Sequence, residues 1–172
     1  MTRPIVAAIR HGALALGLVF ATAAFGQAPA PRPAAAPPAK PLLYGPPITL
    51  DQAKLVMAAA EAEAKKRGVE ETIAIVEPTG ELVMFERPAS AQYAAYEFAI
   101  GKARTSARYR RETKVLFDQL HGGDNAPLNY PDAFVGGAGG IPIVVGGRII
   151  GAIGSTGGAD QDVAAAGAAA LK

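Results

Sequence analysis

The stretch GGIPIVVGGRIIGAIGSTGGADQD, residues 139–162, decides the fold of this chain. Two apolar segments, 142–145 and 148–155, flank the dipeptide Gly146-Gly147. Consecutive glycines tolerate the positive φ that both central positions of a type I′ turn require. The stretch therefore predicts a β-hairpin.

Two further glycines, Gly151 and Gly154, interrupt the second strand and predict a bulge or the close approach of another backbone. The strand then runs through Ser155 and Thr156 into a helix that begins near Ala159. Exposed backbone N–H groups at such a helix start can hold a carboxylate or a phosphate, so we expect Ser155 and Thr156 to contribute to an anion site. The alternative is that these hydroxyls only shape the turn.

The rest of the domain alternates helical and strand patterns. Thr49 and Gln52 form a capping box before an apolar stripe of helical period, and Gly68 ends that helix. The order of elements predicts an antiparallel sheet with helices packed on it, an α+β fold. The expected elements are a helix over 50–67, strands over 72–76 and 81–87, a second helix over 91–110 capped by Ser90, a third over 112–120, a short strand near 133–136, and a last helix from about 159 to the C-terminus.

The first 26 residues have the pattern of a signal peptide. A basic start precedes an apolar run over 12–25, which is too short to span a bilayer comfortably. Small residues favour cleavage after Gly26, with cleavage after Ala28 as the second choice. We therefore expect a periplasmic or secreted protein without a stable membrane anchor after cleavage; the alternative is an uncleaved anchor.

Residues 27–47 contain eight prolines and many alanines, and predict an extended linker. A docking peptide for a partner is the alternative. The predicted folded domain is then 48–172. Four of the 17 lysines and arginines precede it, so 13 basic residues in the domain face 15 acidic ones. This balance does not support binding to nucleic acid.

Several kinds of reactive site are excluded by composition. The chain has no cysteine, which excludes disulfides and a CxxCH haem attachment. His121 is the sole histidine outside the predicted signal peptide, so one chain cannot build a multi-histidine zinc site. No GxSxG or phosphate-binding loop is present. The residues therefore favour a binding protein over an enzyme, although they leave catalysis open.

His121 and two cations are the candidates for binding chemistry. The imidazole of His121 can serve as an axial ligand to haem iron, and its alternative role is that of a loop residue or a helix cap. Arg87 and Lys102 can pair with a ligand carboxylate or with a carboxylate of the protein. Tyrosine hydroxyls offer a further iron ligand or stacking surface, at positions 93, 96, 109 and 130.

Four segments in order resemble the GlcG/HbpS family of haem-binding proteins, to which the PduO C-terminal domain is also related. They are ITLDQAKLVMAAAEAEAKKRG (48–68), AIVEPTGELVMFER (74–87), KARTSA (102–107) and the closing hairpin at 139–162. The resemblance implies a profilin-like three-layer α/β/α sandwich with a five-stranded antiparallel sheet. It also implies assembly into a homo-oligomer and binding of haem or a related tetrapyrrole. Lys102 and Thr105 belong to the matching helix motif and are carried over as binding residues.

The sequence thus predicts an exported, homo-oligomeric haem-binding protein without a catalytic set of its own, acting in haem binding, storage or sensing. Two alternatives stay open. One is an oligomeric scaffold that assists a partner enzyme or sensor. The other is a protein that binds, or acts on, small organic acids through the turn at 154–160.

Overall fold

The computed structural model describes residues 41–171. The predicted signal peptide and residues 27–40 of the predicted linker lie outside this range. Within it, no helix has the length and apolar character needed to cross a membrane.

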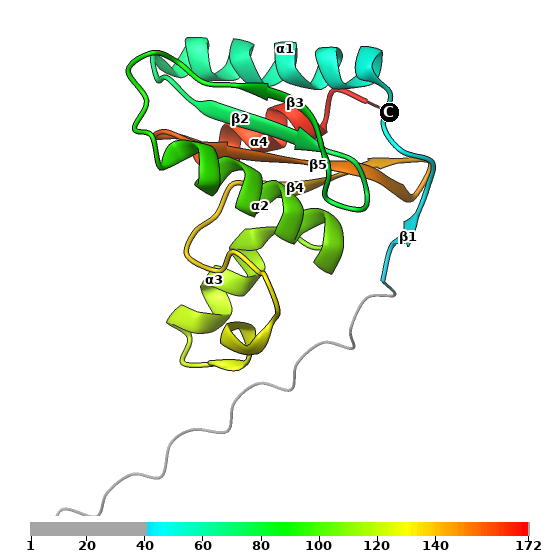
Figure 1. The fold of residues 1–172 in the computed structure, drawn as a ribbon, viewed down its shortest axis with the longest axis vertical. Coiled ribbons are helices and arrows are strands. Elements are labelled where there is room, and N and C mark those ends of the chain that lie inside the picture. The colour runs from blue at the N-terminus through cyan, green and yellow to red at the C-terminus, as the bar shows by residue number, and fades with distance from the viewer. Residues whose placement is uncertain (1–40, 172) are drawn as a thin grey trace, which may run out of the picture. The chain divides into compact units, whose positions relative to one another are not determined.

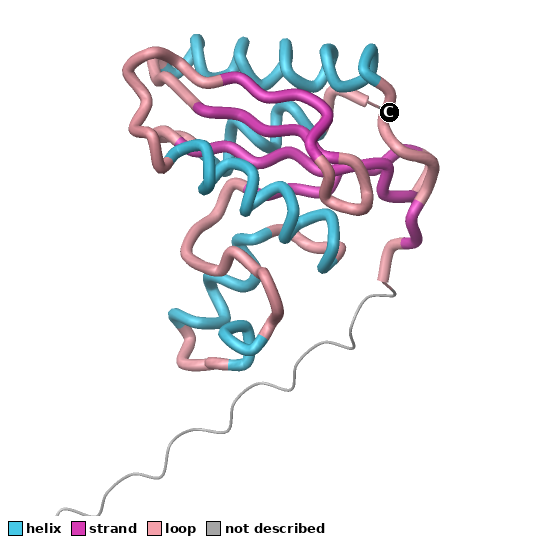
Figure 2. The backbone as a smooth tube through the Cα atoms, in the orientation of Figure 1, coloured by secondary structure: helices cyan, strands magenta, loops and turns pink. Residues whose placement is uncertain are grey.

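Strand β5 (Arg148–Thr156) is the centre of a five-stranded sheet (Figure 2). It pairs antiparallel with β4 (Gly140–Val145) on one side and with β2 (Thr72–Val76) on the other. Strand β3 (Leu82–Glu86) extends the sheet beyond β2 and forms an edge. The predicted hairpin is confirmed, and its Gly146 and Gly147 have φ angles of 56° and 74°.

Strand β1 (Leu43–Tyr44) departs from the prediction, because it pairs with β5 in parallel. The sequence analysis expected an antiparallel sheet throughout and placed these residues in the linker. A short Leu-Leu-Tyr segment between prolines can still join a sheet when its partner offers free backbone groups. The Tyr44 hydroxyl lies 3.0 Å from the carbonyl oxygens of both Ala107 and Arg108, where a helix ends, and shares its one donor proton between them.

Helices cover both faces of the sheet, which confirms the three-layer sandwich (Figure 1). Helices α1 (Leu50–Arg67) and α4 (Asp160–Ala168) pack together on one face. Helix α2 (Ala95–Tyr109) lies on the other face, directly against β5. Helix α3 (Thr113–His121) follows α2, and a short 3-10 helix, η1 (Ala126–Asn129), packs on α3.

The two faces bury different side chains. The α1/α4 face holds the larger core of isoleucine, valine and methionine. The α2 face is built mostly from alanine, so its stability depends on close packing rather than on large side chains. Buried members of the first core include Val56, Met57, Ile73, Ile75, Ile143, Ile153 and Val163; those of the second are Ala74, Val76, Ala99, Ile100, Ala103, Ala107 and Ala152.

Helix α1 follows its sequence signals closely. Thr49 Oγ1 accepts a bond from the Gln52 N–H, and the Gln52 side chain accepts one from the Thr49 N–H, which completes the capping box. Gly68 ends the helix with a φ of 69° and donates to carbonyls of the last turn. The bounds of this helix confirm the prediction.

Three other expectations were wrong. Helix α2 starts at Ala95, because Ser90 does not cap it and instead donates its hydroxyl to the Glu70 carboxylate. No strand forms near 133–136, where Phe134 donates its backbone N–H to a side chain of α2. The last helix stops at Ala168 instead of continuing to the C-terminus.

The contact between α2 and β5 depends on Gly154. A Cβ at this position would lie 2.6 Å from the Ala103 nitrogen and closer still to the Ala99 carbonyl oxygen. The helix backbone therefore rests on the strand with no side chain between them. This confirms the close approach expected from the glycine.

We expect Gly154→Ala to lower the free energy of unfolding by at least about 3 kcal/mol, because the added methyl must push α2 off the sheet. Urea denaturation followed by circular dichroism measures this change. Gly158→Ala is the matched control, since its new Cβ would find no atom nearer than 3.6 Å. A loss for Gly154→Ala no greater than that of the control would contradict the packing described here.

Candidate functional site

A buried cation lies at the junction of α2, β5 and α4. The Lys102 side chain is only 4% exposed, and its Nζ donates to the Ser155 carbonyl at 2.9 Å and to Asp160 Oδ2 at 2.5 Å. The Phe134 ring lies 5.8 Å from the same Nζ. The Lys102 ammonium group thus binds Ser155 and Asp160 within the protein.

The turn predicted to hold an anion does hold a carboxylate, and that carboxylate is Glu71. Its Oε2 accepts the Ser155 hydroxyl at 2.6 Å. Its Oε1 accepts the N–H groups of Gly158 at 2.7 Å and Ala159 at 2.5 Å. Glu71 therefore fills the position that the sequence analysis assigned to an external ligand, and Ser155 helps to hold it.

Glu71 was missed by the sequence analysis. It follows Glu70 and directly precedes β2, and its bond partners lie more than 80 positions further along the chain. The only available signal was the turn itself, which pointed to an anion but not to its source.

The two threonines have separate places. Thr105 is buried and its Oγ1 accepts the Phe134 N–H at 2.6 Å, which ties the loop before β4 to α2. Thr156 lines a small hollow of about 370 Å³ together with Ser90 and Gly157. Thr105 thus serves the fold, while Thr156 borders open space.

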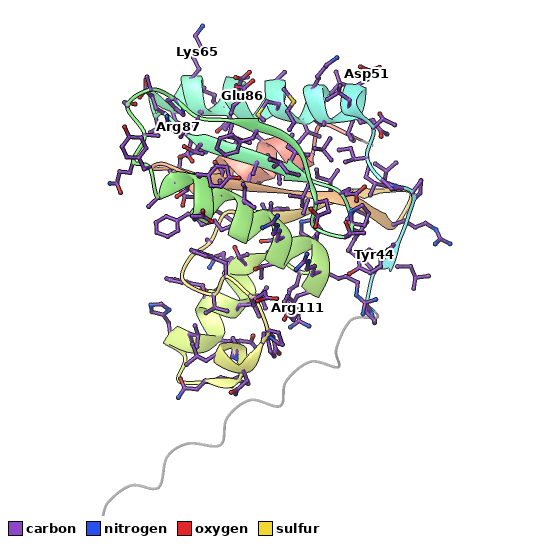
Figure 3. The ribbon with its side chains drawn as sticks, viewed as in Figure 1. Tyr44, Asp51, Lys65, Glu86, Arg87 and Arg111 are labelled. Carbon is purple, nitrogen blue, oxygen red and sulfur yellow. The ribbon has the colours of Figure 1, made fainter. Side chains whose placement is uncertain are left out.

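A larger hollow, a groove of about 700 Å³, lies at the C-terminal end of β3 and is bordered by α1. Apolar atoms of Ala64, Val69, Ile73 and Phe85 contribute to its wall. Its polar members are the cations Lys65 and Arg87 and four acids, Glu61, Glu70, Glu71 and Glu86. Figure 3 shows Lys65, Glu86 and Arg87 at this side of the molecule.

Aromatic side chains continue from the groove onto the surface. The Arg87 guanidinium lies 5.5 Å from the ring centre of Tyr93, and the Phe85 ring lies 5.2 Å from that of Tyr96. Tyr93 is 89% exposed. Arg87 also donates to the Ala91 carbonyl at 3.0 Å, which holds it at the rim. The rim therefore combines a cation, a phenol and apolar surface.

Two of the four carboxyl groups in this groove, those of Glu61 and Glu86, interact with each other. A hydrogen bond with Glu61, together with burial and the like charge of Glu61, raises the pKa of Glu86 from 4.5 to about 7. Near neutral pH, Glu86 is therefore partly protonated, and the groove is less negative than its four acids suggest. Glu70 and Glu71 are already engaged by Ser90 and by the turn, respectively.

His121 lies apart from the groove. It ends α3, on the α2 side of the sheet, and its ring is exposed. Its Nδ1 lies 2.9 Å from the Phe117 carbonyl, and its ring centre lies 3.9 Å from that of Phe117, with the two ring planes tilted by 37°. A Nδ1–H donor there leaves Nε2 free to bind a ligand from solvent.

The structure thus brings Lys102 and Ser155 together, places Arg87 on the groove, and leaves His121 on a different layer. Over residues 41–171, no three His, Cys, Asp or Glu side chains gather closely enough to hold a metal ion.

The buried Lys102–Asp160 pair gives one test. We expect Lys102→Met to lower the free energy of unfolding by about 3 kcal/mol, because a partly buried carboxylate loses its cation. Urea denaturation measures the loss. Lys54→Met, which removes an exposed partner of Asp51, is the control and is expected to cost less than about 1 kcal/mol. Equal losses for the two variants would show that Lys102 is not a structural cation.

The shared proton of Glu86 gives a second test. Because its pKa is near 7 when folded and near 4.5 when unfolded, the folded state binds this proton more tightly. The free energy of unfolding should therefore fall as pH rises from 4.5 to 7 and then level off. We expect Glu86→Gln to remove this component, measured by urea denaturation across that range, whereas the exposed Glu81→Gln should keep it. An unchanged pH slope in Glu86→Gln would contradict the assignment.

Comparison with known proteins places this geometry in a family. A family model described as "Haem degrading protein HbpS-like" matches residues 48–171. Protein GlcG of Escherichia coli K12 is 35% identical over 107 residues, covering 62% of this chain and 79% of GlcG.

Solved structures agree. A double mutant of Streptomyces reticuli HbpS superimposes with a TM-score of 0.66 at 30% identity, covering 81% of this chain and 99% of HbpS. PduOC, solved as a complex with haem, gives a TM-score of 0.65 over 73% of this chain and 96% of PduOC; at 23% identity it shows the fold alone. The match over nearly all of the described residues confirms the resemblance found in the sequence: the chain belongs to the HbpS-like family.

Proposed function

We propose that this protein binds haem, and that the groove between α1 and the end of β3 receives it. Membership of the HbpS-like family, over residues 48–171, is the observation that carries the proposal. The solved complex of PduOC with haem supports it through a shared fold.

The groove residues fit such a ligand. Haem is a flat apolar ring with two carboxylates and an iron that needs an axial ligand. The wall formed by Val69, Ile73 and Phe85 suits the ring, and a volume of about 700 Å³ lies within the range of small-molecule sites. Lys65 and Arg87 would pair with the carboxylates, and the exposed Tyr93 beside Arg87 offers a phenol to ferric iron.

The charge state of the groove's own carboxyl groups affects the proposed binding of haem. Ionised Glu61 and Glu86 would repel the carboxylates of haem, and protonation of Glu86 relieves part of that repulsion. Haem, when bound, supplies an iron centre and a visible absorption band. The protein's residues supply orientation and partial exclusion of water.

We further propose an accessory role, in which an exported homo-oligomer holds or senses haem without transforming it. The scarcity of reactive groups supports this role: His121 is the one histidine of the described residues, and it lies away from the groove. Exposed aromatic surface at Tyr93, Tyr96 and Phe98 supports association of copies.

Titration of purified protein with haemin tests the proposal. We expect a saturable shift of the Soret band. Arg87→Ala should weaken binding about 10-fold, because a charged hydrogen bond to a carboxylate is lost. Tyr93→Phe should change the spectrum through loss of the phenol oxygen. Lys66→Ala, an exposed cation on α1 outside the groove, is the matched control.

His121→Ala separates the two candidate iron ligands. We expect its haemin spectrum to match that of the unaltered protein. A spectrum changed by His121→Ala but not by Tyr93→Phe would place the iron at α3 and refute the groove. Absence of any saturable Soret shift would refute haem binding itself, and steady loss of the band after binding would refute the accessory role.

A further inference from the structure

A third hollow lies between β1 and the turn of the β2–β3 hairpin. It measures about 430 Å³ and is lined by Tyr44, Pro78, Thr79 and Arg108; we call it the Tyr44 hollow. It shares no lining residue with the groove. In Figure 3, Tyr44 and Arg87 lie at opposite ends of the domain. The walls offer the flat faces of a phenol ring and a proline ring.

Two arginines of α2 are anchored at the hairpin turn beside this hollow. Arg108 Nε donates to the Thr79 carbonyl at 2.8 Å, and Arg104 Nε donates to the Gly80 carbonyl at 3.0 Å. Gly80 has a φ of 93°, and a Cβ there would come within 2.8 Å of Arg108 Nε. The glycine therefore makes room for both arginines. A guanidinium has five N–H donors, so each anchored group keeps several for another partner.

A third guanidinium, that of Arg110, contacts the Tyr44 ring, which lines the hollow. Arg110 lies 5.6 Å from the Tyr44 ring centre and donates to the Leu42 carbonyl at 3.2 Å. Its acceptor, like those of Arg104 and Arg108, is a neutral carbonyl. The hydrogen bonds that hold these three guanidinium groups in place therefore go to neutral carbonyls and not to carboxylates.

Carboxylates are scarce around these arginines. Other cations of the described domain do form close ion pairs, such as Lys114 with Asp118 at 2.7 Å. At the hairpin turn, the Glu77 carboxylate accepts the Thr79 hydroxyl at 2.8 Å. Within residues 41–171, the one carboxylate within 4 Å of these three arginines is Glu81, whose Oε1 lies 3.9 Å from Arg108 Nη2. That separation is too long for a hydrogen bond. The hollow therefore combines fixed positive charge with apolar walls.

We propose that the Tyr44 hollow binds a small organic anion, a carboxylate carried on a flat apolar body. The carboxylate would pair with the guanidinium groups of Arg104 and Arg108, whose planar forks match its geometry. The flat body would lie against Tyr44 and Pro78. This site is independent of the haem groove.

Isothermal titration of the domain with naphthoate tests the proposal. We expect saturable binding that weakens at high salt, whereas naphthylmethanol, the neutral analogue, should bind at least about 10-fold more weakly. Inorganic phosphate distinguishes recognition of charge alone, because it lacks the apolar body. Phosphate binding equal to that of naphthoate would refute the role of the walls.

Three variants locate the site. Arg108→Gln should weaken naphthoate binding about 10-fold. Glu81→Gln removes the one carboxylate within 4 Å of Arg108 and should tighten binding about 2-fold or more; its side chain is 67% exposed, so the fold is retained even if Arg108→Gln unfolds. Lys66→Gln, an exposed cation on α1, is the matched control. No naphthoate binding, or equal affinity in Glu81→Gln and the unaltered protein, would overturn the proposal whatever the result with haemin.

Discussion

The close approach of helix α2 to strand β5 at Gly154 is the constraint on which the rest of the structure depends. Because no side chain separates the two backbones, the neighbouring Lys102 reaches the carbonyl of Ser155 and the carboxylate of Asp160. The same contact sets the end of β5, and with it the turn that leads into α4. The absence of a side chain at Gly154 thus determines where Lys102 and the start of α4 lie.

In that turn, a carboxylate of the same chain occupies the anion site. The N–H groups of Gly158 and Ala159 bind Glu71, which also takes the Ser155 hydroxyl. The carboxylate joins the start of β2 to the start of α4, so it stabilises the end of the sheet beside the groove. In the proposed haem site, recognition of the ligand would then depend on the rim residues, above all Arg87, Lys65 and the exposed Tyr93.

The sequence predicted best what depends on neighbours along the chain. The capping box at Thr49, the glycine hairpin and the bounds of α1 and β2 were all correct, because each is decided within a few residues. The predictions were wrong where a residue distant in sequence determines the local structure. Ser90 bonds Glu70 instead of capping α2. Leu43–Tyr44 pairs with β5, about a hundred positions further along the chain. The candidate site divides in the same way. Lys102 and Ser155 could be singled out from local motifs, but Glu71 and the Glu61–Glu86 pair are brought together only by the fold.

The attachment of β1 has a mechanical consequence. The chain enters the domain at a strand that pairs with the central β5, and the Tyr44 hydroxyl fastens it to the end of α2. A force applied to the chain before β1 would therefore act on the central strand β5 and on helix α2 together, and not on an edge strand alone. Tension on β1 would also reach the Tyr44 hollow, since Tyr44 belongs both to β1 and to the wall of the hollow.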